Sequence, residues 1–138
     1  MKKILFVCSG NTCRSPMAEG IFNKIAKERG IDAIADSVGC ATYGGDGVSE
    51  NSLVVCREIG VDLSEHRSKG LTVEAVENAD IIVPMGDSHY HVLKYYFPNK
   101  EGILPALGVP DPYGSDEDVY RECRDQIVKG LEDIADKI

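Results

Sequence analysis

Cys8-Ser9-Gly10-Asn11-Thr12-Cys13-Arg14-Ser15 is the stretch that organises this chain of 138 residues, and it directly follows the apolar run Ile4-Leu5-Phe6-Val7. The apolar run predicts a buried β-strand. Gly10 and Asn11 tolerate the unusual backbone angles of a tight loop, and Ser15-Pro16 provides a favourable cap and first helical residue. The stretch is therefore expected to be a short loop between a strand and a helix, with its backbone amides pointing inward.

Such a loop is suited to binding an anion, because inward amides and a helix N-terminus both favour negative charge. The same field favours the thiolate form of a cysteine at its centre, here Cys8. Arg14 adds a planar guanidinium that can hold two phosphate oxygens at once. The alternative is a buried structural cysteine beside an ordinary turn, but the strand, the Gly-Asn pair and the following helix together favour a phosphate-binding loop. No Gly-Lys-Ser/Thr follows the glycine, so the loop is not of the nucleotide-binding type.

Length and composition predict one domain, residues 1–138, with a single core. The formal net charge of −8 argues against nucleic acid and against an anionic membrane as partners. We expect no signal peptide, because Lys2-Lys3 precede only a short apolar strand, and no apolar run is long enough to span a bilayer. Five cysteines without a secretory signal indicate a reducing compartment. The expected protein is cytoplasmic and monomeric.

The remaining cysteines and the histidines show no metal-ligand spacing, so we expect neither a metal site nor a cofactor. The histidines, which are scattered, are His66, His89 and His91. Cys40, Cys56 and Cys123 are interpreted as small, buried or half-buried hydrophobic residues.

Strand-like and helical patterns alternate along the chain, which is typical of a parallel sheet covered on both faces. The expected strands are residues 3–7, 33–38, 79–84 and 101–104, and the expected helices are 16–29, 49–59, 72–78, 87–97 and 117–138. The predicted fold is therefore α/β: a three-layer, Rossmann-like arrangement with a four-stranded parallel sheet flanked by helices. In such sheets ligands bind at the carboxyl ends of strands, which is where Cys8 lies.

A second chemical element is Asp111-Pro112-Tyr113-Gly114, in a loop rich in proline and glycine before the last helix. A cysteine that attacks phosphorus needs a proton donor for the leaving group, and an aspartic acid on a stiff loop can supply it. Taken alone, the segment is more easily interpreted as a plain turn. Together with the cysteine loop, Asp111 is favoured as a general acid that then serves as the base for water.

Two segments carry a family resemblance: Val7-Cys8-x-Gly10-Asn11-x-Cys13-Arg14-Ser15-Pro16-Met17-Ala18-Glu19, and Asp111-Pro112-Tyr113. Over essentially the whole chain, the sequence resembles the low-molecular-weight protein-tyrosine-phosphatase family. The resemblance implies a phosphoprotein phosphatase with a cysteinyl-phosphate intermediate and no metal, in which Cys8 attacks, Arg14 clamps the phosphate, and Asp111 is acid and then base. Its phosphate-binding loop would also contain Ser9, Gly10, Asn11, Thr12, Cys13 and Ser15.

The resemblance further implies that Ser37 and His66 join Asn11 and Ser15 in hydrogen bonds that support the loop, and that Tyr43 and Tyr113 wall the substrate cleft. From the residues alone, only the need of Asn11 for support in a left-handed conformation is apparent. Cys13, in the same loop as Cys8, is expected to form a disulfide with it after oxidation, which would make the enzyme redox-sensitive.

Thr12 departs from the tyrosine-specific pattern, in which many members carry isoleucine. Threonine here resembles the bacterial branch that acts on phosphoarginine, and a hydroxyl tolerates a guanidinium better than a methyl-rich wall does. We therefore slightly favour phosphoarginine over phosphotyrosine as the substrate.

Two alternatives come from other functional classes. A thioredoxin-linked arsenate reductase of the same fold would need two further cysteines after the third strand, and residues 85–91 contain none. A non-catalytic phosphoprotein-binding module would not need the combination of Cys8, Arg14 and Asp111.

Overall fold

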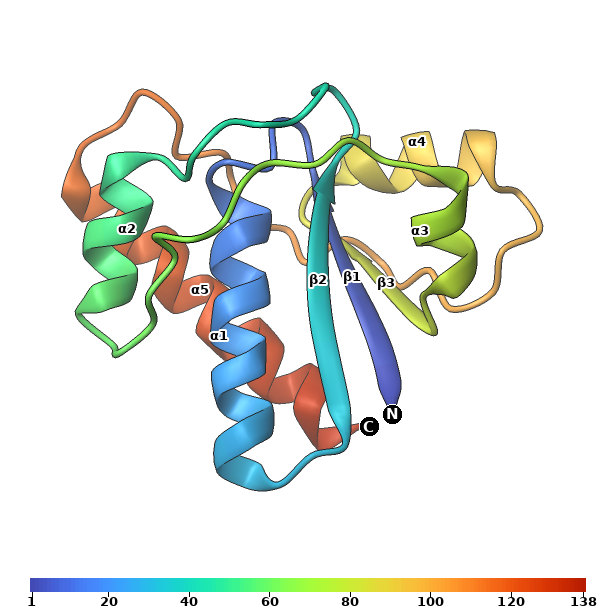
Figure 1. Cartoon of the computed structure of the whole chain (residues 1–138), viewed down its shortest axis with the longest axis horizontal. Helices are drawn as coiled ribbons and strands as arrows, with labels where there is room; N and C mark the ends of the chain where they lie inside the picture. The colour runs from blue at the N-terminus through green and yellow to red at the C-terminus, as the bar shows by residue number, and fades with distance from the viewer.

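The computed structural model describes residues 1–138, the whole chain. Three parallel strands form one sheet in the order β2-β1-β3 (Figure 1): β1 (Lys2–Cys8), β2 (Ala33–Gly39) and β3 (Ile81–Pro84). The register pairs Cys8 with Gly39 on one side of β1, and Val7 with Pro84 on the other. The carboxyl ends of the three strands therefore meet at one edge of the sheet.

The prediction of a fourth strand at residues 101–104 is wrong in its extent, because the segment forms only one bridge with the sheet. The segment pairs with β3 through a single parallel bridge between Ile82 and Ile103, where the N–H of Ile82 donates to Gly102 and its carbonyl accepts from Leu104, both at 2.9 Å. Gly102 has a φ of 85°, in the left-handed region that a strand does not use. The ladder therefore cannot continue past one residue.

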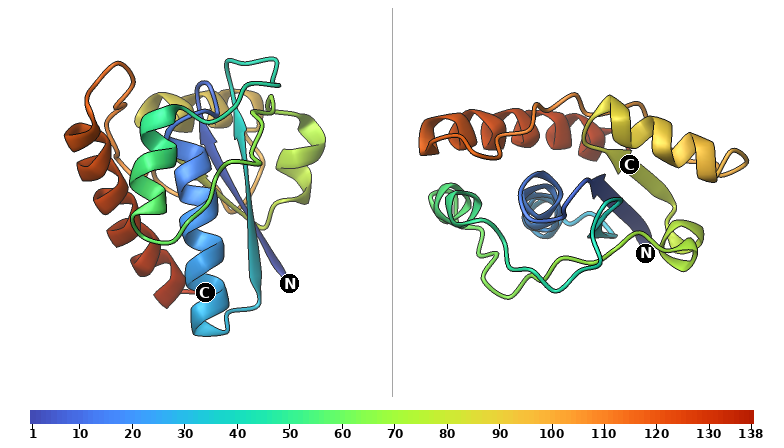
Figure 2. Two further views of the ribbon diagram at one scale, coloured as in Figure 1. Left: turned by 60° about the vertical axis from the view of Figure 1, so that its left-hand side comes forward. Right: turned by 90° about the horizontal axis from the view of Figure 1, so that it is seen from above.

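Helices cover both faces of the sheet, so the three-layer α/β class is confirmed (Figures 1 and 2). One face carries α1 (Arg14–Arg29), α5 (Glu117–Asp136) packed beside it, and α2 (Glu50–Arg57) against both. The other face carries α3 (Val73–Asn78) and α4 (Asp87–Tyr96). All five expected helices and the first three strands are confirmed, with ends shifted by one to a few residues.

The central strand β1 separates two clusters of buried side chains. Ile4, Phe6 and Cys8 face the α1 side, whereas Leu5 and Val7 face α3 and α4, as the two-residue period of a strand requires. Because both faces are covered, β1 is a continuous apolar run rather than an alternating one. This double burial fixes the point at which the chain leaves the sheet and enters the cysteine loop.

The five cysteines are all free thiols. Cys56 and Cys123 are buried and Cys40 is partly buried, which confirms their interpretation as hydrophobic residues. Burial raises the pKa of the Cys56 and Cys123 thiols to about 12.

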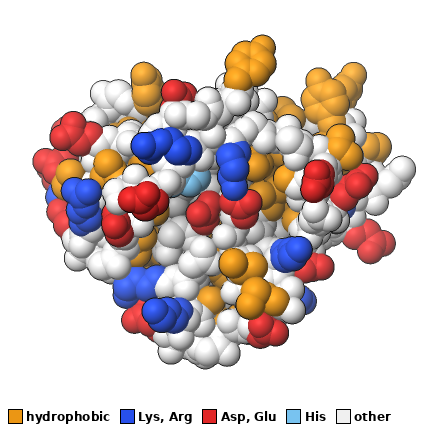
Figure 3. All heavy atoms as spheres, viewed as in Figure 1, with side chains coloured by type: hydrophobic (Ala, Val, Ile, Leu, Met, Phe, Trp, Pro, Cys, Tyr) orange, Lys and Arg blue, Asp and Glu red, His pale blue; other side chains and the backbone are white.

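The surface in Figure 3 mixes acidic and basic side chains, and exposed apolar side chains project at its upper edge, toward which the carboxyl ends of the strands point in Figure 1. None of the helices combines the length and the apolar character that crossing a membrane requires.

Candidate active site

A pocket of about 170 Å³ opens at the carboxyl end of β1. Eight residues line it, from the loop after β1 and from the segment before α5: Cys8, Ser9, Gly10, Thr12, Cys13, Arg14, Asp111 and Tyr113. The fold therefore brings together the two segments that the sequence singled out, about a hundred residues apart.

Ser15 contacts the sulfur of Cys8, with 2.8 Å between Oγ and Sγ. The side-chain amide of Asn11 donates to the same Ser15 oxygen at 2.8 Å, which leaves the Ser15 hydroxyl hydrogen free for the sulfur. The Ser15 hydroxyl is therefore placed to donate to the Cys8 sulfur. The expectation that Ser15 caps α1 is wrong: α1 begins at Arg14, and the position before it, Cys13, makes no side-chain cap.

Asn11 is the centre of the hydrogen bonds beneath the loop. Its φ of 55° confirms the expected left-handed conformation, and its side chain is fully buried. Its amide nitrogen also donates to Ser37 Oγ at 2.9 Å. Its amide oxygen accepts from the backbone N–H of Lys69 at 2.9 Å and lies 3.2 Å from His66 Nε2. An unusual backbone conformation is thus held by partners from three separate segments.

His66 and Glu19 form the outer layer of this support. Nε2 of His66 faces two acceptors, the backbone and side-chain oxygens of Asn11 at 3.3 and 3.2 Å, so this nitrogen carries a hydrogen. Nδ1 lies 3.8 Å from the Glu19 carboxylate, which accepts from Ser37 at 2.7 Å. Burial raises the pKa of Glu19 and lowers that of His66. Burial therefore disfavours both the charged carboxylate of Glu19 and the charged imidazolium of His66.

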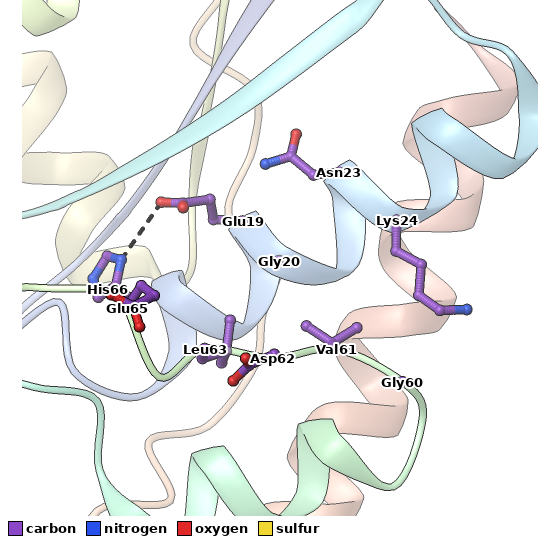
Figure 4. A pocket seen from close by; sticks show the side chains of 10 residues that line it. All are labelled: Glu19, Gly20, Asn23, Lys24, Gly60, Val61, Asp62, Leu63, Glu65 and His66. Atoms are coloured by element: carbon purple, nitrogen blue, oxygen red, sulfur yellow. Dashed lines mark ion pairs between the residues drawn. The ribbon is translucent and has the colours of Figure 1, made fainter.

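Figure 4 shows Glu19 and His66 facing each other at one end of a groove of about 450 Å³ along the outer side of α1. The groove shares no lining residue with the Cys8 pocket. It lies behind the loop, and the pair belongs to the support of the loop.

Arg14 is held at the wall of the pocket by α1 and by the backbone before α5. Its Nη1 donates to the carbonyl of Val109 at 3.0 Å, and its Nη2 lies 3.8 Å from Oδ2 of Asp111. The other carboxylate oxygen of Asp111 accepts from the backbone N–H of Tyr113 at 3.1 Å. Only 9% of the Arg14 side chain but 55% of the Asp111 side chain is exposed. Asp111 therefore stands at the mouth of the pocket and Arg14 within its wall.

The two expected aromatic walls differ in position. Tyr113 lines the pocket and remains largely exposed. Tyr43 is fully exposed, at 108%, and is not among the lining residues. Thr12 also lines the pocket, and the only hydrogen-bond partner of its hydroxyl is the sulfur of Cys13, at 3.9 Å.

The sulfur of Cys13 contacts two residues that the sequence did not indicate. Its sulfur lies 3.4 Å from both Ser49 Oγ and Tyr120 OH. Burial raises the pKa of Tyr120 to about 12, so its phenol stays protonated. No sequence signal marks either contact, because Ser49 precedes α2 and Tyr120 lies on α5.

His89, which the sequence left as one of three scattered histidines, lies under the loop. It is 2% exposed, and its Nε2 is 2.9 Å from Ser9 Oγ. Its position in the first turn of the helix after β3 is the signal that could have found it, because that strand ends at the same edge of the sheet as β1.

A buried cysteine and a buried arginine in one loop after a parallel strand are typical of phosphatases that bind phosphate at such a loop. The family model described as low molecular weight phosphotyrosine protein phosphatase matches residues 3–138. The chain therefore belongs to the low-molecular-weight phosphotyrosine protein phosphatase family, as the sequence resemblance predicted, and is a protein phosphatase.

Three similar proteins show the range within this family. The crystal structure of a low molecular weight protein tyrosine phosphatase from T. tengcongensis superposes with a TM-score of 0.95, at 35% identity over 100% of both chains. The protein-arginine-phosphatase of Bacillus subtilis (strain 168) is 32% identical in an alignment that covers 98% of this chain and 95% of that protein. The arsenate reductase of Halalkalibacterium halodurans is 34% identical in an alignment that covers 98% of this chain and 96% of that protein.

Proposed function

We propose that the protein hydrolyses phosphoarginine in phosphorylated proteins, through a cysteinyl-phosphate intermediate on Cys8. The observation that carries this choice is Thr12, which lines the pocket and whose hydroxyl has no oxygen or nitrogen hydrogen-bond partner. A guanidinium brings several N–H donors that need acceptors, whereas the ring of a phosphotyrosine brings none. The similarity to the protein-arginine-phosphatase of Bacillus subtilis also supports phosphoarginine over phosphotyrosine.

In the first half-reaction, the Cys8 thiolate attacks phosphorus and the bond to the leaving nitrogen breaks. The carboxylic acid of Asp111 gives its proton to that nitrogen, so arginine leaves with its guanidinium protonated. The inward amides of the loop and the fork of Arg14 hold the phosphoryl oxygens as their charge changes. The burial of Arg14 and its bond to Val109 support this role, because they fix the guanidinium before substrate arrives.

In the second half-reaction, the Asp111 carboxylate takes a proton from water, the water oxygen attacks phosphorus, and the bond to sulfur breaks. Phosphate and the Cys8 thiolate are the products. The hydroxyl of Ser15, 2.8 Å from the sulfur, stabilises this leaving thiolate. Asn11, Ser37 and His66 act by holding the loop in its binding conformation.

Tyr113 is proposed as a wall of the substrate cleft, stacking on a guanidinium or a phenyl ring. Tyr43 is proposed as the second wall only in the substrate complex, because its side chain is fully exposed in the free protein. The partner is a phosphorylated protein. We propose that the phosphatase acts as a cytoplasmic monomer, and the five free thiols support a reducing compartment.

Arsenate reduction is the second candidate, and the similarity to the reductase of Halalkalibacterium halodurans favours it. The thioredoxin-linked reaction would need a relay of two further cysteines. No cysteine follows β3 before α5, and the two most buried candidates, Cys56 and Cys123, have pKa values raised to about 12 by burial. The phosphatase is therefore the better proposal. Turnover of p-nitrophenyl phosphate separates it from a binding module, and turnover of arsenate with thioredoxin separates it from the reductase.

The substrate is tested by the ratio of kcat/KM on a phosphoarginine protein to that on a phosphotyrosine peptide. Thr12→Ile should lower this ratio by roughly 10- to 200-fold, because it removes an acceptor and adds bulk. Thr12→Ser is the matched control, since it keeps the hydroxyl and should keep the ratio. A ratio in Thr12→Ile within twofold of wild type would assign the enzyme to phosphotyrosine.

A further inference from the structure

The pocket has a second hydroxyl, that of Ser9, and a buried histidine holds it. Ser9 lines the pocket and is exposed to it, while His89 is 2% exposed beneath the loop. The Oγ of Ser9 lies 2.9 Å from Nε2 of His89, and no other side chain bonds to this hydroxyl. A buried ring and a pocket-lining hydroxyl, eighty residues apart in sequence, thus form one hydrogen-bonded pair.

The direction of this hydrogen bond follows from the other ring nitrogen. Nδ1 of His89 accepts from the backbone N–H of Gly86 at 3.0 Å, so Nδ1 carries no hydrogen. A neutral imidazole has one N–H, which must then be on Nε2. His89 therefore donates to Ser9, and the Ser9 oxygen accepts.

The surroundings keep His89 in this neutral form. Burial and the nearby positive charge of Arg14 lower the pKa of His89, and the carboxylate of Asp111 opposes them only in part. Arg14 and His89 both lie close to the backbone of Gly86. A Cβ atom at this position would be within 3.6 Å of both side chains. The Nε2 donor of His89 therefore holds the Ser9 hydroxyl from beneath the loop.

A serine oxygen that accepts one hydrogen bond still has a second lone pair and its own hydrogen. Because His89 supplies the first bond and fixes where the oxygen lies, the second lone pair and the O–H remain available to a ligand in the pocket that Ser9 lines. The free O–H suits a phosphoryl oxygen, and the free lone pair suits an N–H of the substrate. A phenyl ring offers no such N–H.

We propose that Ser9 is a specificity-determining residue for the guanidinium of phosphoarginine, and that His89 is its positioning residue. The Ser9 oxygen accepts from a guanidinium N–H, so the loop recognises this group through two hydroxyls, one on Ser9 and one on Thr12. This inference rests on the phosphoarginine reaction proposed above. It adds to that reaction a residue pair that joins the loop to α4.

The test uses three single variants of the full chain. Ser9→Ala removes the acceptor. His89→Asn keeps an acceptor at the Nδ1 position for Gly86 but removes the donor to Ser9, whereas His89→Gln keeps a donor at the Nε2 position. For each variant we would measure kcat/KM on a phosphoarginine protein and on a phosphotyrosine peptide, with the melting temperature as a control for folding.

Ser9→Ala and His89→Asn are each expected to lower the phosphoarginine to phosphotyrosine ratio by roughly tenfold, the usual effect of one lost hydrogen bond. His89→Gln should restore most of the ratio, and the double variant Ser9→Ala/His89→Asn should be no worse than either single variant. Nitrogen NMR of wild type should show His89 protonated at Nε2 and not at Nδ1.

Ratios within twofold of wild type in both Ser9→Ala and His89→Asn would overturn the inference and leave the phosphoarginine reaction standing. Equal loss in His89→Asn and His89→Gln would overturn the positioning role of His89. A wild-type enzyme with no phosphoarginine activity would overturn the proposed substrate and this inference together. If His89→Asn does not fold, Ser9→Ala alone decides.

Discussion

Arg14, in the wall of the pocket, faces Asp111 at its mouth, with 3.8 Å between Nη2 and Oδ2. The contact is weak, because more than half of the Asp111 side chain is in solvent, and exposed ion pairs contribute at most about 1 kcal/mol. A phosphate dianion can accept both outer N–H groups of the guanidinium at once, and therefore replaces the carboxylate easily. The free enzyme thus holds its proposed clamp and its proposed acid next to each other at the pocket that the phosphoryl group would enter.

Replacing Asp111 by asparagine should slow substrates with poor leaving groups by roughly 10²–10⁴-fold, the usual contribution of general acid catalysis. Aryl phosphates with very good leaving groups need no proton in the first half-reaction and should be slowed less. The measurement is kcat/KM over a series of aryl phosphates of different leaving-group pKa. A penalty that is the same for every leaving group would leave Asp111 as a turn residue only.

Replacing Cys8 by serine should abolish turnover and retain phosphate or vanadate binding. The backbone loop and Arg14 are unchanged by this substitution, so the anion site remains. Turnover of p-nitrophenyl phosphate and calorimetric binding of vanadate measure the two properties separately. A residual rate of even a tenth of wild type would contradict the covalent mechanism.

Arg14→Lys should also cause a severe loss of kcat/KM, because an ammonium cannot form two parallel bonds to phosphate oxygens or reach the Val109 carbonyl in the same way. Thermal unfolding would show whether the variant keeps its fold. A near-normal rate would show that Arg14 does not hold the phosphate during the reaction.

Mild peroxide should inactivate the enzyme reversibly. Peroxide oxidises the Cys8 thiolate to a sulfenic acid, and the Cys13 thiol then attacks that sulfur and releases water, leaving a disulfide. Tyr120→Phe removes one of the two groups that hold the Cys13 sulfur and should speed this closure. Mass spectrometry should find the Cys8–Cys13 bridge, and dithiothreitol should restore activity. Irreversible oxidation of Cys8 beside a free Cys13 would refute the pairing.

His89 should make the folded state less stable as the pH falls. Its pKa is lowered in the fold, so below the ordinary value of about 6.5 the unfolded chain binds more protons. The stability that neutral His89 gives to the folded state is fully present above the ordinary pKa of histidine. It is lost as the pH falls toward the lower pKa that His89 has in the fold. Between pH 7 and pH 5, His89→Gln should therefore lose less free energy of unfolding in urea than wild type. The two proteins share all other titrating groups. An equal loss of free energy of unfolding in both would therefore contradict the lowering of the His89 pKa by burial.

The sequence by itself determined the elements and the loop. The apolar run from Ile4 to Val7 and the residues of the following loop act within a few positions of one another, so their pattern predicts the strand, the turn and the helix. The length of the segment at residues 101–104 was not predictable in this way, since Gly102 takes a left-handed φ where it meets β3. Ser15 was expected to act on its own helix, but Asn11 and Cys8 engage its hydroxyl instead.

Only the tertiary structure decided which distant side chains serve the loop. Glu19 follows the loop by one turn of helix and reaches Ser37 and His66, while His89 reaches Ser9. The tertiary structure also leaves Tyr43 exposed to solvent, away from the pocket that Tyr113 lines. The reason is physical: a strand or a turn is set by neighbours along the chain, whereas a buried hydrogen bond depends on how the strands and helices that carry its two partners pack together.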